Sequence, residues 1–75
     1  MIDKVKSIIC DFKPEYDFNE SDNFVTDGYL DSLDIIELIG LMEKEFSIKF
    51  TSDDIKIENF ISFQNLTNLI QKKKS

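Results

Sequence analysis

Histidine is absent from this chain, and cysteine and proline occur once each, as Cys10 and Pro14. A structural zinc site is excluded because its usual ligands are missing, and one cysteine cannot form an internal disulfide. The absence of histidine also removes the usual base that activates a serine nucleophile. The only glycines are Gly28 and Gly40. Such sparse turn residues favour a few, mostly helical elements.

Long apolar runs are also missing. None approaches the roughly 18–20 residues that cross a bilayer, and Met1 leads directly into Asp3 and Lys4 instead of a signal peptide. We therefore expect no membrane insertion and, given the single cysteine, a reducing, cytoplasmic location. The 75 residues, of which 41% are hydrophobic, can form one core but not a core plus a deep catalytic pocket. Residues 1–75 are thus expected to form a single domain.

Negative charge is concentrated in one part of the chain. Residues 15–45 contain ten acidic residues and one lysine, whereas the rest of the chain contains five acidic residues and eight lysines. The first part has a formal charge of −9 and the rest +3, for a total of −6. This field repels nucleic acids and anionic lipids and attracts lysine- and arginine-rich protein surfaces. The charge alone is explained equally well by solubility.

Apolar residues at helical spacing predict three main helices. The first covers about residues 2–12 and stops before Pro14, because the residue before a proline disfavours helical geometry. The second covers about residues 31–46, with Asp or Ser as its N-cap, and the third about residues 62–72, capped by Ser62. We expect a small all-α bundle of three main helices plus one short helix, with a long loop between helices 1 and 2.

The connections carry apolar residues of their own. Four of them are expected to hold the loop 14–31 on the core: Phe18, Phe24, Val25 and Leu30. Ser52 is expected to cap the short helical turn, whose apolar contacts come from three residues: Ile55, Ile57 and Phe60.

The second helix has two different faces. Five apolar residues fall within one arc of about 100°, the width of a core stripe: Ile35, Leu38, Ile39, Met42 and Phe46. Leu33 and Ile36 lie outside that arc among acidic residues, so they are expected to be exposed. Scattered exposed apolar residues are common, which makes this a modest indication of a binding face.

A turn ends in Ser32 at the start of this helix. Ser32 cannot act as a catalytic nucleophile, since the chain has no histidine and the nearest lysine, Lys44, lies over three helical turns away. A calcium loop aligned on Gly28 fails because Val25 occupies a ligand position. We expect no metal site and no catalytic activity. The helix start favours an attached anion, although plain N-capping is the commonest role of such a serine.

The run from Gly28 to Leu38, centred on Asp31-Ser32-Leu33, resembles the motif of acyl carrier proteins and of related peptidyl and aminoacyl carrier domains. With length, acidity and helix order, the resemblance covers nearly the whole chain. It implies that Ser32 carries 4′-phosphopantetheine, donated by coenzyme A and attached by a separate phosphopantetheinyl transferase. The thiol of the arm would hold acyl intermediates as thioesters in fatty-acid, polyketide or other secondary-metabolite biosynthesis.

The same resemblance implies a recognition face for partner enzymes, made of six residues: Asp31, Leu33, Asp34, Ile36, Glu37 and Glu43. Its expected partners are the transferase, an acyl- or aminoacyl-loading ligase and downstream synthases with basic docking patches. Leu33 would be an apolar anchor within a salt-sensitive contact. The carrier itself is expected to be a monomer.

The cargo stays open at this point. Tyr29-Leu30 before the motif is closer to stand-alone aminoacyl carriers, such as the D-alanine carrier, and to peptidyl carrier domains. Asp34 and the helix that follows are closer to the fatty-acid type, from which Gly40 and Lys44 depart. A remote alternative is a non-catalytic acidic helical adaptor that binds a basic partner without any prosthetic group.

Overall fold

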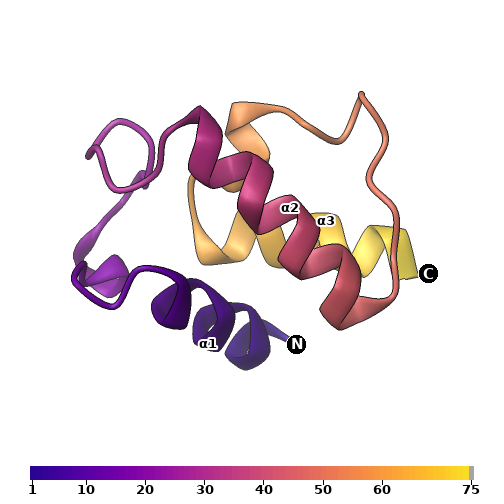
Figure 1. Cartoon of the computed structure of the whole chain (residues 1–75), viewed down its shortest axis with the longest axis horizontal. Coiled ribbons are helices and arrows are strands. Elements are labelled where there is room, and N and C mark those ends of the chain that lie inside the picture. Colours follow the sequence, from indigo (N-terminus) through magenta and orange to yellow (C-terminus); the bar gives the residue numbers. More distant parts are fainter. Residues whose placement is uncertain (75) are drawn as a thin grey trace.

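The computed structural model describes residues 1–74 and contains three α-helices around one core (Figure 1). These are α1 (Ile2–Phe12), α2 (Ser32–Phe46) and α3 (Phe63–Lys74). Two 3₁₀ helices, η1 (Phe18–Glu20) and η2 (Ile57–Phe60), lie in the connections. The part of the chain that the structure describes has no strand. The predicted all-α class with three main helices is confirmed. The short helix expected after helix 2 is the 3₁₀ helix η2, and η1 is an additional one in the loop before α2.

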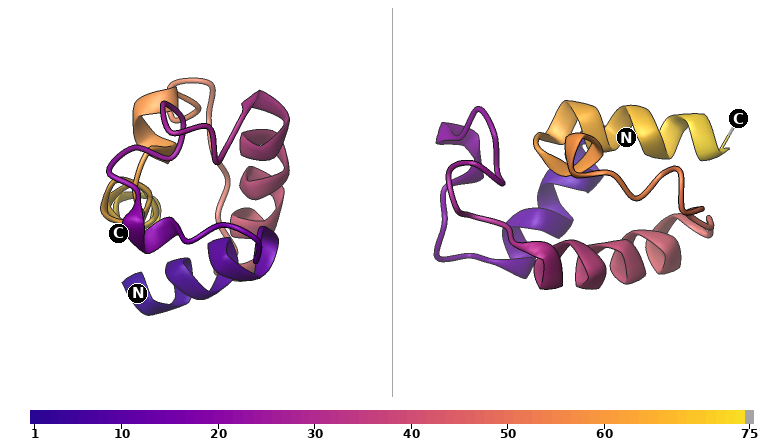
Figure 2. Two further views of the ribbon diagram at one scale, coloured as in Figure 1. Left: turned by 90° about the vertical axis from the view of Figure 1, so that its left-hand side faces the viewer. Right: turned by 90° about the horizontal axis from the view of Figure 1, so that it is seen from above.

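The arrangement of the helices brings η2 to the start of α2. Helix α1 packs against both α2 and α3. Helices α2 and α3 run in the same general direction on two sides of the core (Figure 2). The segment 47–62 therefore has to return along the molecule, and it carries η2 back to the first turns of α2. There Ser32 and Ile57 line one groove.

The loop between α1 and α2 is held by aromatic packing. Helix α1 ends before Lys13, as predicted from Pro14, and the loop then buries Phe18 and Phe24, each 1% exposed. The ring of Phe24 lies edge-on to Phe18 at 4.9 Å and to Phe63 of α3 at 5.0 Å between centroids. Edge-to-face geometry of this kind is favourable beyond simple area burial. The prediction that apolar residues hold this loop on the core is confirmed; Leu30 is also buried, and Val25 is half-buried.

The helical projection correctly identified the buried face of α2. Four of its five core positions are buried, and the fifth, Ile39, is half-buried against them. Leu33 and Ile36 are exposed, as predicted. The helix ends at Phe46 with Ser47 in the left-handed conformation (φ 56°), and the N–H of Ser47 donates to the carbonyl of Glu43.

The prediction for the segment after α2 was wrong in two respects. Residues 52–54 form a turn and not a helix, and η2 has Lys56, not Ser52, at its N-cap position, without a side-chain cap bond. The Asp54 carboxylate accepts the N–H of Thr51 at 2.8 Å within that turn. Ile55 and Ile57 are 45% and 59% exposed instead of packed inward. Only Phe60 is buried, as expected.

Helix α3 is close to its prediction. The Ser62 hydroxyl accepts the N–H of Asn65 at 3.0 Å, so the expected cap is confirmed, but the helix runs on to Lys74. Its buried face includes one polar residue, Thr67, which is 2% exposed. Among the described residues, the Thr67 hydroxyl has no hydrogen-bond partner.

Candidate functional site

The start of α2 leaves the Ser32 hydroxyl free. Asp31 is the N-cap: its carboxylate accepts the N–H of Asp34 at 2.9 Å, and Asp34 Oδ2 accepts the N–H of Asp31 at 3.1 Å. This reciprocal pair is a capping box. Ser32 follows as the first helical residue, exposed, and its hydroxyl has no partner within residues 1–74. Ser32 is therefore not the N-cap, and its hydroxyl is available for another role.

An apolar groove of about 210 Å³ lies beside this hydroxyl. Six residues line the groove. Ser32, Ile35 and Ile36 come from the first turns of α2, and Ile55, Lys56 and Ile57 come from the segment that leads into η2. Only Lys56 among the six is charged. The groove begins where α2 presents its free N–H groups and the positive end of its dipole. A substituent on Ser32 thus meets an electropositive helix end and an apolar wall.

The expected recognition residues fall into two groups. Leu33 and Ile36 are 71% and 62% exposed, and Asp31 and Glu37 are exposed as well. These four side chains face solvent around Ser32. Asp34 and Glu43 are only half-exposed, and each has a hydrogen-bond partner elsewhere in the chain.

Asp34 is held by the end of α1. Lys13 Nζ donates to Asp34 Oδ2 at 2.7 Å, with the side chains of the pair 23% and 15% exposed. Partial burial raises the pKa of Asp34, but the hydrogen bonds from Lys13 and from the Asp31 N–H outweigh it, so the pKa lies below its usual value. The hydrogen bond to Asp34 raises the pKa of Lys13. The pair is ionised at neutral pH, which makes it a charge-assisted link between α1 and α2.

Glu43 has a comparable role at the other end of α2. Its Oε2 accepts the N–H of Phe50 at 2.8 Å and so ties the chain leaving the helix back to the last turns. Lys74 Nζ donates to the carbonyl of Phe46 at 3.2 Å, which satisfies one of the free carbonyls of the helix end.

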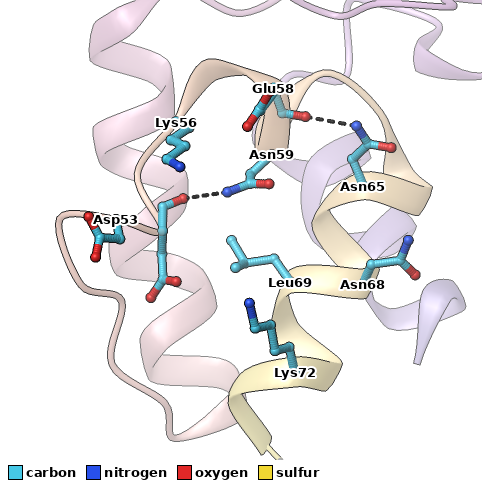
Figure 3. Close-up of a pocket in the computed structure, with 9 residues that line it drawn as sticks. Asp53, Lys56, Glu58, Asn59, Asn65, Asn68, Leu69 and Lys72 are labelled. Carbon is cyan, nitrogen blue, oxygen red and sulfur yellow. Dashed lines mark hydrogen bonds between the residues drawn. The ribbon is translucent and has the colours of Figure 1, made fainter.

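A second, larger pocket of about 540 Å³ lies between the segment before α3 and α3 itself (Figure 3). Two of its amide side chains are committed to the fold. Asn59 Nδ2 donates to the carbonyl of Asp54, and Asn65 Nδ2 donates to the carbonyl of Glu58, both at 2.7 Å. These bonds fix the segment that carries Ile55 and Ile57. The two hydrogen bonds therefore hold one wall of the Ser32 groove in place.

Other chemistry is limited in this molecule. Cys10 is half-buried in α1. Within residues 1–74, no group of three or more cysteine, aspartate and glutamate side chains is placed to hold a metal ion. No helix in the same range is long and apolar enough to cross a membrane.

Sequence reasoning missed three groove residues and one ion-pair partner. Ile55 and Ile57 were expected to face the core, and no role was assigned to Lys56 or Lys13. The spacing of Ile55 and Ile57 was the available sign in the sequence. In an extended segment, residues two apart lie on the same side of the chain, so both side chains can face away from the core. Nothing local indicated that Lys13 meets Asp34, because the two are 21 residues apart.

The chain matches known proteins over nearly its whole length. A family model described as "Phosphopantetheine attachment site" matches residues 3–71. The chain is similar to the acyl carrier protein of Solidesulfovibrio magneticus, with 38% identity over 78 residues that cover 96% of this chain and 92% of the relative. It is 36% identical over 74 residues to the acyl carrier protein of Buchnera aphidicola subsp. Acyrthosiphon pisum (strain APS), covering 95% and 89%. No solved structure matches significantly.

Proposed function

The chain belongs to the acyl carrier protein family, and on this basis we propose that Ser32 is the residue to which its prosthetic group is attached. Members of this family are carriers, and this chain carries acyl groups on covalently bound 4′-phosphopantetheine. It interacts with a phosphopantetheinyl transferase and with biosynthetic enzymes. The group supplies the terminal thiol on which the acyl group is held as a thioester.

One observation carries the assignment of Ser32. Its hydroxyl is exposed and unpartnered among the described residues and lies at a helix start. Ser21 donates to Asp27 and Ser62 caps α3, whereas the exposed serines Ser7, Ser47 and Ser52 do not lie at a helix start. The phosphodiester would be held through Ser32 Oγ, where the free N–H groups of α2 favour an anion. The apolar groove offers its isoleucine side chains to the uncharged part of the arm. The residues present therefore fit the group.

A docking face for partner enzymes surrounds this serine. We define it by six exposed residues that border Ser32: Asp31, Leu33, Ile36, Glu37, Ile55 and Ile57. Exposed apolar side chains with an acidic rim suit a partner that offers an apolar pocket within a basic patch. The other two expected residues, Asp34 and Glu43, support this face through their bonds within the chain.

We further propose that the chain catalyses no step itself and delivers its cargo as a cytoplasmic monomer. The cargo belongs to fatty-acid, polyketide or related biosynthesis. Identification of the thioester on protein from native cells decides between an acyl group and the aminoacyl or peptidyl alternative. Gel filtration with light scattering measures the oligomeric state.

The assignment of Ser32 is tested by intact-mass measurement. Apo-protein incubated with coenzyme A and a broad-range transferase is expected to gain the mass of one phosphopantetheine group. Ser32→Ala is expected to gain none, and Ser7→Ala, an exposed serine on α1, to behave as the wild type. Unmodified wild-type protein with several transferases, together with undiminished partner binding by Ser32→Ala, would support the acidic adaptor instead.

A further inference from the structure

A cluster at the junction of α1 and α2 is not explained by carrier function alone. Lys13 Nζ lies 2.7 Å from Asp34 Oδ2 and 3.3 Å from the carbonyl oxygen of Tyr29. It therefore binds the residues on both sides of the segment 30–33 that contains Ser32. Lys13 thus brings a positive charge to the acidic stretch 15–45, which contains one lysine of its own, Lys44.

Aromatic side chains hold this lysine in place. Its Nζ lies 5.4 Å from the centroid of the Tyr16 ring, a distance at which an ammonium group is attracted to the ring face. Tyr16 in turn stacks on Tyr29, with 4.8 Å between centroids and 16° between planes. The carbonyl of Tyr29 accepts from Lys13, and its ring packs on the residue that orients Lys13. The cluster of Lys13, Tyr16, Tyr29 and Asp34 is closed on itself.

The same carboxylate oxygen connects the cluster to the helix start. Asp34 Oδ2 accepts from both Lys13 Nζ and the N–H of Asp31. Asp31 precedes Ser32 directly, so the lysine fixes the peptide next to the serine through a single oxygen. Without Lys13, that oxygen would keep an unpaired negative charge at a helix end that otherwise favours anions. Coenzyme A, which carries several phosphates, has to approach this end.

We propose that Lys13 is a positioning residue for the loading of Ser32: by holding and neutralising Asp34, it keeps the start of α2 in the form that the transferase modifies. The proposal rests on the assignment of Ser32 as the attachment residue. Lys13 acts through Asp34 and touches neither the hydroxyl nor the donor.

Steady-state kinetics of the transferase, with the full-length carrier as varied substrate and coenzyme A saturating, test this role. Lys13→Met is expected to lower kcat by about fivefold, equivalent to about 1 kcal/mol, with KM changed by less than about twofold. Lys4→Met is the matched control, since it removes the same charge from α1, the helix that Lys13 directly follows, and breaks an exposed ion pair with Glu45. Its kcat is expected to equal that of the wild type. Lys13→Arg is expected to recover most of the loss.

A double-mutant cycle identifies the route of the effect. If Lys13 acts through Asp34, then adding Lys13→Met to Asp34→Asn lowers kcat by less than about twofold. An undiminished loss in the Asp34→Asn background, or no loss in the wild-type background, overturns the proposal. If Lys13→Met is unfolded by circular dichroism, Lys13→Gln, which keeps most of the stem, takes its place. A wild-type protein that is never modified refutes the assignment of Ser32 instead.

Discussion

Replacement of Thr67 by valine is expected to stabilise the protein. Thr67 lies in the middle of α3, 2% exposed, and its hydroxyl has no hydrogen-bond partner among the described residues. Burial takes this hydroxyl out of water without compensation. Valine has nearly the same shape and a similar helix propensity, so the change removes the polar atom and leaves the packing of the core intact.

The expected gain follows from the cost of the lost hydrogen bonds to water. An unsatisfied buried polar group costs about 1–3 kcal/mol, and the lower end applies to a neutral hydroxyl near a helix backbone. We expect Thr67→Val to raise the free energy of unfolding by about 1 kcal/mol. For a domain of this size, the melting temperature then rises by about 4–8 °C.

Thermal and urea unfolding of the apo-protein, followed by circular dichroism, measure the effect. Thr67→Ser is the control, because it keeps the hydroxyl and removes the methyl group; it is expected to be less stable than the wild type by about 1 kcal/mol. A Thr67→Val variant that is no more stable than the wild type would refute the reasoning. The hydroxyl would then have a partner, such as an enclosed water or a backbone carbonyl of the preceding turn.

Two further predictions concern the docking face and the loss of stability at acidic pH. Leu33→Ala is expected to weaken transferase binding about tenfold, measured by calorimetry, and to change the free energy of unfolding by less than about 0.5 kcal/mol. The control is Leu41→Ala, which should leave the affinity unchanged. Leu41 is also exposed on α2, but it lines a groove between α2 and α1. Equal losses would contradict the proposed face. The hydrogen bond from Lys73, followed by that from the Thr51 N–H, lowers the pKa of Asp54 to about 2. Because the folded pKa is below the unfolded value of about 3.9, the extra stability of wild type over Asp54→Asn should be complete above about pH 5, decline as the pH falls through the folded pKa, and be lost by about pH 1. A stability difference that does not change with pH in urea unfolding would rule out this ion pair.

Local patterns were sufficient to predict the helices and the exposure of Leu33 and Ile36. The bounds of α1 follow from a regular apolar stripe that ends before Pro14, and the start of α2 follows from a residue type that caps helices. The exposure of Leu33 and Ile36 follows from geometry alone, since both lie off the arc of the buried stripe. These features depend only on near neighbours in the chain.

The segment after α2 could not be predicted for the opposite reason. Its shape depends on side chains that come from α3, such as Asn65, which binds the carbonyl of Glu58, and Lys73, which pairs with Asp54. No periodicity marks such contacts in the sequence. The walls of the groove and the Lys13–Asp34 pair can therefore be identified only from the structure. The motif around Ser32, in contrast, can be recognised from the sequence alone.

Two adjacent residues at the start of α2 have separate duties, and this separation has a consequence for turnover. Asp31 caps the N-terminus of α2, so a substituent on the Ser32 hydroxyl oxygen does not disturb the hydrogen bonds of the helix backbone. If Ser32 is the attachment residue, as proposed, we expect the arm to be added and removed without unfolding of the helix start. Amide exchange rates in the turns of α2 beyond the first should accordingly be the same before and after attachment of the arm.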